Sequence, residues 1–328
     1  MRSITKRGKI NVLLLVVASL VVPLLLKNNY YYDIFIMAGV YAIIGSGMNL
    51  LLGFTGQLSM GHAAFYGFGA YITAIGTKSY GIPFAVCLLM AVGVCFVMGM
   101  LLGSTSCKLS GIFLVVVTTG FNTVVNLLFV NWEFTGKSFG ITGIPKPLLF
   151  GSPMTKLQYC YLILAFVFLA LFCSYRIVRS KTGRAFQAMR DNPIAAKSVG
   201  INVSKYKLLV FAVSAVYAGV AGGLYAANIG YISPTSFNAN VSVTIITMTV
   251  LGGLGDLAGC IVGAVVVGVL MEILQQFGAY QLTIYGLLIV LILIFMPKGI
   301  MGGVRSLYAR IDTRLQKNKA QKAEQTGR

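Results

Sequence analysis

Residues 176–207, RIVRSKTGRAFQAMRDNPIAAKSVGINVSKYK, form a long polar segment between hydrophobic stretches of the chain. The segment carries eight Lys or Arg residues and one acidic residue, and its pattern predicts two short helices. Thr182 can cap the first helix. Asn192 can cap the second, with Pro193 at its first position and Gly200 just past its end. A capped helix between two membrane spans is a candidate docking element, although a basic loop that only fixes orientation would show the same charge.

The composition is that of a membrane protein. Of the 328 residues, 57% are hydrophobic and only 10% are charged. Several apolar runs are long enough to cross a hydrocarbon core of roughly 30 Å. These runs are continuous, whereas the strands of a transmembrane barrel alternate apolar and polar residues. The sequence therefore predicts an all-α polytopic membrane protein with about ten transmembrane helices.

Ten segments are predicted to span the membrane, and the linker at residues 53–57 is expected to be tight. Segment 241–251 is short for a crossing. With both termini on the same side the number of spans is even, so this segment must cross if the other nine do; a re-entrant segment would favour eight spans. The predicted spans are residues 10–26, 34–52, 58–76, 83–106, 110–130, 157–178, 208–229, 241–251, 257–275 and 280–296.

The basic residues predict the orientation. If both termini and residues 176–207 are cytoplasmic, Lys108 lies on the same side, which then holds 21 of the 26 Lys and Arg residues, in agreement with the positive-inside rule. The net charge of +19 is then explained by topology, and no nucleic-acid partner is expected. The predicted divisions are a basic cytoplasmic N-terminus (1–9), a transmembrane domain (10–300) with an outer loop (131–156), and a basic cytoplasmic tail (301–328).

The sequence contains no recognisable catalytic, nucleotide or metal site. The six Cys residues lie in or beside apolar spans without metal-ligand spacing, and no Ser-His-Asp set can be argued around the single His. A G-x-x-x-x-G-K-[ST] loop is absent. Spans also lack the series of buried acids that a proton-driven pump would need. Any active transport would therefore draw its energy from a partner.

A few polar residues in or beside the spans are candidates for a translocation path. Asn122 and Asn126 are four residues apart and share a helix face. For each candidate the competing interpretation is hydrogen bonding at an interface or between helices. The candidates are Gln57, Ser59, His62, Asn122 and Asn126.

Small residues predict close helix packing and a weak internal repeat. A stripe of Ala215, Gly219, Gly223 and Ala227 recurs every four residues, a spacing that lets helix backbones approach. Residues 56–70 and 255–268 both open with Gly, a polar residue and Leu, and both continue with small residues. Such an echo fits a transporter built from repeats, although Gly-rich helices also match by chance.

Five segments together resemble the branched-chain amino acid ABC transporter permeases of the LivM type. The resemblance covers nearly the whole chain after the first span, and it rests on residues 53–74, 183–215, 221–226, 249–264 and 297–303. It implies an ABC importer permease fold in the bacterial inner membrane, with no cofactor of its own. The implied partners are a second homologous permease, two cytoplasmic ATPase subunits that use ATP, and an extracytoplasmic substrate-binding protein.

The resemblance also implies a role for the basic segment. The family's coupling pattern of two Ala residues followed by Gly matches Ala195, Ala196 and Gly200. Asp191 to Gly200 would dock in a groove of an ATPase subunit. Ile194 stands where the wider importer pattern has Glu, which leaves the contact details open. The implied coupling residues are Arg184, Arg190, Asp191, Pro193, Ala195, Ala196 and Gly200.

Two alternatives remain beside a permease for Leu, Ile and Val. The first is a related ABC importer for urea, amides or simple sugars, which would differ in its binding protein. The second is an ATP-independent secondary carrier, against which stand the docking-type segment and the scarcity of buried charge.

Overall fold

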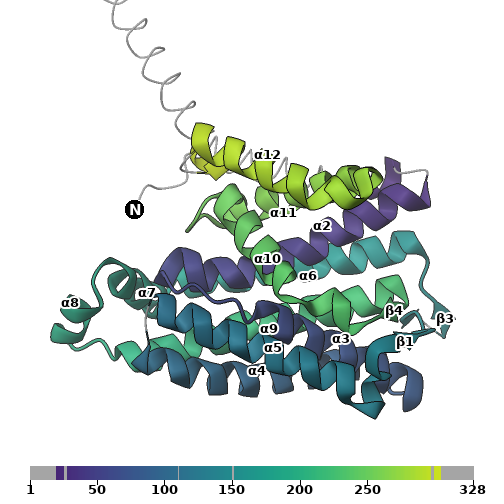
Figure 1. The fold of residues 1–328 in the computed structure, drawn as a ribbon, viewed down its shortest axis with the longest axis horizontal. Coiled ribbons are helices and arrows are strands. Elements are labelled where there is room, and N and C mark those ends of the chain that lie inside the picture. Colours follow the sequence, from purple (N-terminus) through teal and green to yellow (C-terminus); the bar gives the residue numbers. More distant parts are fainter. Residues whose placement is uncertain (1–19, 26–27, 110, 150, 297–298, 304–328) are drawn as a thin grey trace, which may run out of the picture.

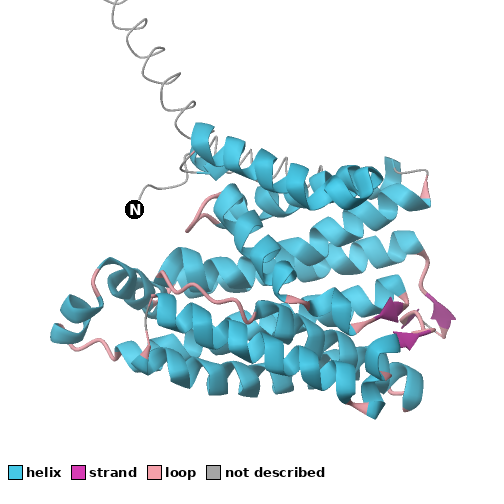
Figure 2. Ribbon diagram, in the orientation of Figure 1, coloured by secondary structure: helices cyan, strands magenta, loops and turns pink. Residues whose placement is uncertain are grey.

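A computed structural model describes residues 20–25, 28–109, 111–149, 151–296 and 299–303. Nearly all of the described chain is helical (Figures 1 and 2). The predicted first span, residues 10–26, lies largely outside the described residues, as do the basic N-terminus and almost all of the basic tail.

The predicted hydrophobic segments form helices. In the described part, six helices are long and apolar enough to cross a membrane, and α10 and residues 283–292 of α12 are shorter apolar helices. The helices are α2 (Asn29–Met48), α3 (His62–Ser79), α4 (Phe84–Lys108), α5 (Ile112–Asn131), α6 (Lys156–Arg179), α7 (Lys181–Asp191), α8 (Pro193–Ser198), α9 (Val203–Ile229), α10 (Ala239–Gly252), α11 (Leu257–Leu274) and α12 (Gln281–Phe295).

Several helix ends differ from the prediction because polar side chains cap them. Helix α2 begins at residue 29, where the Asn28 side chain accepts a hydrogen bond from the Tyr30 amide at 3.3 Å. Helix α9 begins at residue 203, where Asn202 accepts from the Lys205 amide at 3.1 Å. A hydropathy pattern does not register such caps, so it placed both starts five residues late.

The linker before α3 is also different. Residues 53–57 were expected to form a tight turn with a span starting at 58, but residues 56–61 are not helical and α3 begins at His62. Figure 2 shows this linker running inward from the end of the bundle that carries α7 to the start of α3. The linker is largely buried: Gln57, Ser59 and Gly61 all lie inside the protein.

Helix α9 is the centre of the packing, and small residues allow it. A Cβ atom added to Gly69 of α3 would lie 1.9 Å from the Gly219 carbonyl oxygen, and one added to Gly222 would lie 1.9 Å from the Tyr66 carbonyl oxygen. On its α4 side, the Ala215 Cβ is 2.7 Å from the position of a Cβ on Gly99. The prediction that the small-residue stripe serves helix packing is confirmed.

The basic segment and the predicted outer loop lie at opposite ends of the bundle (Figure 1). Within residues 131–156, strand β1 (Ile141–Thr142) pairs antiparallel with β4 (Tyr231–Ile232), and β2 (Leu148–Leu149) pairs with β3 (Ser152–Pro153). The arrangement agrees with the predicted placement of these two segments on different sides of a membrane.

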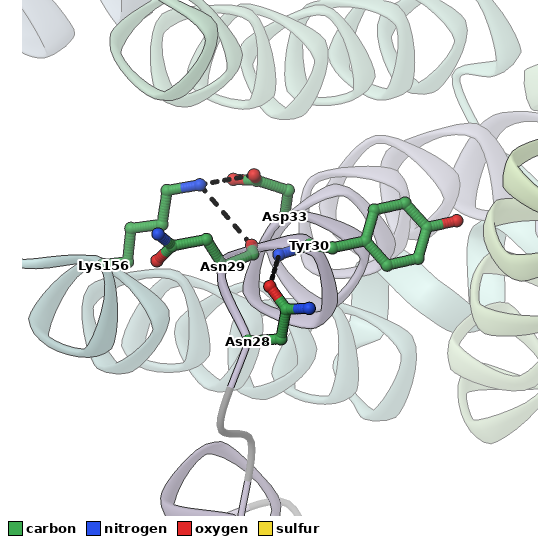
Figure 3. A network of polar contacts seen from close by, with 5 residues as sticks. All are labelled: Asn28, Asn29, Tyr30, Asp33 and Lys156. Atoms are coloured by element: carbon green, nitrogen blue, oxygen red, sulfur yellow. Dashed lines mark hydrogen bonds and ion pairs between the residues drawn. The ribbon is translucent and has the colours of Figure 1, made fainter.

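An ion pair joins two helices at the strand-bearing end. The Lys156 ammonium at the start of α6 contacts the Asp33 carboxylate of α2 and donates to the Asn29 carbonyl oxygen at 3.4 Å (Figure 3). Thr155 and Gln158 form a reciprocal cap at the same helix start. These contacts fix the first turn of α6 against the first turn of α2.

Candidate functional site

The two helices predicted in the basic segment are present as α7 and α8. The Asn192 side chain caps α8 by accepting from the Ile194 amide at 3.0 Å and the Ala195 amide at 3.1 Å, as predicted. The predicted cap of α7 was wrong by two residues. Ser180 has extended backbone and accepts from the amide of Thr182, which already lies inside the helix.

Helix α7 is fixed to the end of the bundle. The Phe186 side chain is fully buried, and its ring meets the Tyr206 ring of α9 edge to face, with centroids 6.2 Å apart. A Cβ atom on Gly183 would lie 2.1 Å from the Val178 carbonyl oxygen, so α6 and α7 meet at a corner too close for any side chain. A force applied to α7 would therefore reach α6 and α9 directly.

Helix α8 presents apolar side chains to solvent on a basic corner. Ile194 is 80% exposed and Val199 is 75% exposed. Gly200 turns the chain with φ of +82° and open space around its Cα. Both side chains are therefore accessible at this corner for contact with another protein.

The predicted coupling residues fall into two groups. Arg184, Arg190, Asp191, Pro193, Ala195 and Gly200 are exposed. Ala196, by contrast, is only 3% exposed and packs within the chain itself. The Arg190 guanidinium turns back toward the bundle and donates to the Gly53 carbonyl oxygen. The sequence did not identify Ile194 and Val199 as surface residues, because two apolar residues in a basic segment do not show whether their side chains point to solvent or to the protein interior.

The predicted path residues gather where the linker before α3 meets α5 and α10. The Met60 amide donates to the Thr118 hydroxyl of α5 at 3.0 Å. The Ser242 hydroxyl of α10 donates to the Met60 carbonyl at 2.7 Å and accepts from the Ala63 amide at 3.0 Å. Thr118 and Ser242 therefore hold the non-helical linker in place. Neither was predicted, since hydroxyl side chains are common in spans.

Asn122 and Asn126 lie along the side of α5 toward this junction. The Asn126 side-chain amide donates to the Pro234 carbonyl at 2.7 Å, which ties α5 to the turn before α10. Asn122 is 2% exposed. Hydrogen bonding between elements, the competing interpretation, therefore describes Asn126. It does not describe Asn122, whose Oδ1 has no hydrogen-bond partner among the described residues.

Three path residues carry buried polar atoms without a hydrogen-bond partner in the described part of the chain. These atoms are Gln57 Oε1, Asn122 Oδ1 and the two ring nitrogens of His62. Each such atom costs about 1–3 kcal/mol of stability. Non-helical backbone at membrane depth is tolerated where it is buried in protein or lines a cavity. The junction therefore combines unpaired polar atoms with a buried, non-helical linker.

Neither junction resembles a metal centre. Among the described residues, no group of three or more His, Cys, Asp or Glu side chains could hold a metal ion. The linker site offers hydrogen-bonding groups, and the α8 corner offers an exposed surface.

Comparison with known proteins gives consistent matches. The profile of the family described as branched-chain amino acid transport system/permease component matches residues 30–296. The chain is 36% identical to the LivM permease protein of a high-affinity branched-chain amino acid transport system in Salmonella typhimurium, over 82% of this chain and 69% of that protein. It is 35% identical to the protein of the same description in Escherichia coli, with the same coverage.

A more distant relative is the BraD permease protein of a high-affinity branched-chain amino acid transport system in Pseudomonas aeruginosa. It is 27% identical, over 81% of this chain and 92% of that protein. No solved structure matches the chain significantly.

Proposed function

Because the chain belongs to the branched-chain amino acid transport system permease family, we propose that it is the translocation subunit of an ATP-driven importer for Leu, Ile and Val. The observation that carries the proposal is the projecting α8 corner, a capped helix with Ile194 and Val199 exposed. A self-sufficient carrier would have no use for such a surface. The chain itself binds no cofactor in this proposal, and partner subunits hydrolyse the ATP.

The α7–α8 end faces the cytoplasm of a bacterial cell in this proposal. Eight Lys and Arg residues lie in residues 176–207, and such residues are retained on the cytoplasmic side. The ten-span arrangement, with both termini cytoplasmic, requires α10 to cross. Its 14 residues extend about 21 Å, short of a core of roughly 30 Å, so the turn before it would enter the membrane.

Docking would use the exposed face of α8. Ile194, Ala195 and Val199 would enter an apolar groove of an ATPase subunit, and Arg184 would supply charge complementarity. Asn192, Pro193 and Gly200 would hold the helix in its projecting position. Ala196 would contribute from inside, by keeping α8 close to the rest of the chain. A second permease and a second ATPase would complete the assembly, and an extracytoplasmic binding protein would deliver the substrate.

The path would run along the linker before α3. ATP-driven rocking of the helices would open the junction alternately to each side. Gln57 Oε1 and Asn122 Oδ1 are acceptors suited to a substrate ammonium, and a ring N–H of His62 suits a carboxylate. The ring of Phe65 lies 6.1 Å from that of His62 and 5.5 Å from that of Phe121, which provides apolar surface for a branched side chain.

The test is purification of the tagged chain from native membranes in mild detergent, followed by uptake by the reconstituted assembly. We expect a second permease and two P-loop ATPase subunits to co-purify, and ATP-dependent uptake of Leu, Ile or Val when the binding protein is added. Preferential uptake of urea, amides or simple sugars would change the substrate. A lone chain that transports without ATP would refute the importer and favour a secondary carrier.

A further inference from the structure

Two glycine turns that are far apart in the sequence meet beneath α7. The first follows a π-helical turn, Asn49–Gly53, that ends α2 and leads into the linker before α3. The second, residues 252–256, joins α10 to α11. The fully buried Asn49 side chain connects them, because its Oδ1 accepts from the Gly255 amide at 2.9 Å and its Nδ2 donates to the Asp256 carbonyl at 3.1 Å.

The contact between the turns excludes side chains. A Cβ atom on Gly53 would lie 1.9 Å from Asn49 Oδ1 and 2.6 Å from the Gly255 amide nitrogen. Gly255 has φ of +79°, which favours glycine independently of the space available. The two turns are therefore in direct backbone contact. A displacement of one turn would displace the other, because no flexible side chain lies between them.

Arg190 closes this contact from the side of α7. Its Nη1 donates to the Gly53 carbonyl oxygen and lies 3.2 Å from the position of a Cβ on Gly255, while its Cγ lies 3.4 Å from that of a Cβ on Gly56. The guanidinium also lies at the C-terminal end of the α2 helix, where a positive charge is favourable. Arg184 and Lys181 on the same helix are exposed like Arg190, but the side chain of neither has a hydrogen bond or ion pair with the described residues.

We propose that Arg190 and Asn49 form a clasp that transmits movement of α7 and α8 to α3 and α11. Arg190 is then a positioning residue for transport and not a docking contact, although its charge and its place in the basic segment suggest docking. The proposal rests on the proposed function, because it needs an ATPase that moves α8. The π-helical turn that carries Asn49 is itself a rare feature that often occurs at functional sites.

The clasp explains how a surface event could reach the path. From Gly53 the chain continues directly into the buried linker of residues 56–61, which contains Gln57 and Ser59 and ends at His62. A movement of α7 that pulls on the Gly53 carbonyl would act on the first residues of this linker. The same pull would act through Asn49 on the turn that starts α11.

The test compares Arg190→Ala with Lys181→Ala in the reconstituted assembly, with Asn49→Ala as an independent break of the same clasp. Lys181 is an exposed basic residue of the same helix to which no docking role is assigned. We measure the ATPase subunits recovered, the ATP hydrolysis rate, and the substrate molecules transported per ATP. For Arg190→Ala and Asn49→Ala we expect normal recovery of ATPase subunits but at least about tenfold less transport per ATP. The double variant should be no worse than the more severe single variant, because both break one unit. Lys181→Ala should keep normal recovery of ATPase subunits and the normal ratio.

Three results would overturn the clasp. A folded Arg190→Ala chain that loses its ATPase subunits would make Arg190 a docking residue and leave the proposed function standing. A normal transport-to-ATP ratio in Arg190→Ala would show that the contact is only structural. Additive losses in the double variant would show that the two residues act separately. If the unmodified chain recovers no ATPase at all, the proposed function fails first, and the two failures are thereby distinguished.

Discussion

Replacing Ile194 by Asp tests the docking surface with a magnitude that follows from the structure. Ile194 is 80% exposed, so a partner groove can bury most of a side chain whose complete burial is worth about 1.5–3 kcal/mol. Ile194→Asp removes this favourable free energy of burial and adds a carboxylate that would have to be desolvated in the groove. We expect the ATPase contact to weaken by at least about 1–2.5 kcal/mol, which corresponds to a dissociation constant roughly 5- to 70-fold larger.

The fold should tolerate this change. Ile194 makes no buried contact, and substitutions at such surface positions usually alter the free energy of unfolding by less than about 0.5 kcal/mol. Ala196→Glu, two residues further on, should behave differently, because Ala196 is 3% exposed and a buried carboxylate would disrupt the chain itself. Melting temperature in detergent separates the two effects.

The assay is titration of the purified ATPase subunit against the tagged chain in detergent. Phe139→Asp is the matched control, because Phe139 is 87% exposed but lies in the loop at the opposite end of the bundle. We expect full ATPase affinity for Phe139→Asp and the stated loss for Ile194→Asp, both with unchanged melting temperature. Equal affinity of the two variants for the ATPase would refute the assignment of α8 as the docking surface.

Three further predictions concern packing, the ion pair and the path. Gly222→Ala places a Cβ atom 1.9 Å from a carbonyl oxygen of α3 and should lower the free energy of unfolding by about 1–3 kcal/mol or more. Gly120→Ala adds a Cβ atom in open space and should not lower the free energy of unfolding. Denaturation of both variants in detergent measures the difference. A double-mutant cycle of Lys156→Met and Asp33→Asn should give a coupling energy below about 1 kcal/mol, because both side chains are partly exposed to water. A larger coupling energy would show that the ion pair is shielded from water. His62→Phe should abolish uptake while ATPase recovery and melting temperature are kept, because it removes unpartnered polar atoms but retains a ring; normal uptake would make His62 a packing residue.

Hydropathy was sufficient to predict the helical class and the approximate position of the spans in the described part of the chain. It failed at residues 58–61, where Leu58 and Met60 continue the apolar pattern but the backbone is not helical. The reason is tertiary: hydroxyls from α5 and α10 satisfy the linker's backbone groups in place of helical hydrogen bonds. No local window contains that information, because Ser242 is 182 residues from Met60 in the sequence.

The roles of the two arginines of α7 could not be separated from the sequence either. Arg184 and Arg190 lie in the same short helix, and charge alone gives both the same expectation. Their difference depends on what lies opposite each side chain. Arg190 meets the Gly53 carbonyl, which is 137 residues away in the sequence, and only the folded arrangement of α2 and α7 brings the two together.

The glycine turns also bear on the internal echo between residues 56–70 and 255–268. In both places an apolar helix ends in a glycine turn at the α7 end of the bundle, and the chain then returns as a helix, from α2 to α3 and from α10 to α11 (Figure 1). Chance similarity between Gly-rich helices would not require the two turns to touch, yet Asn49 hydrogen-bonds across them. Repeated units related by an axis along the membrane normal would place equivalent turns at the same end, as observed. In such an arrangement one side chain, Arg190, can act on both units at once, which gives a physical reason for the proposed coupling helix to serve two halves of the chain.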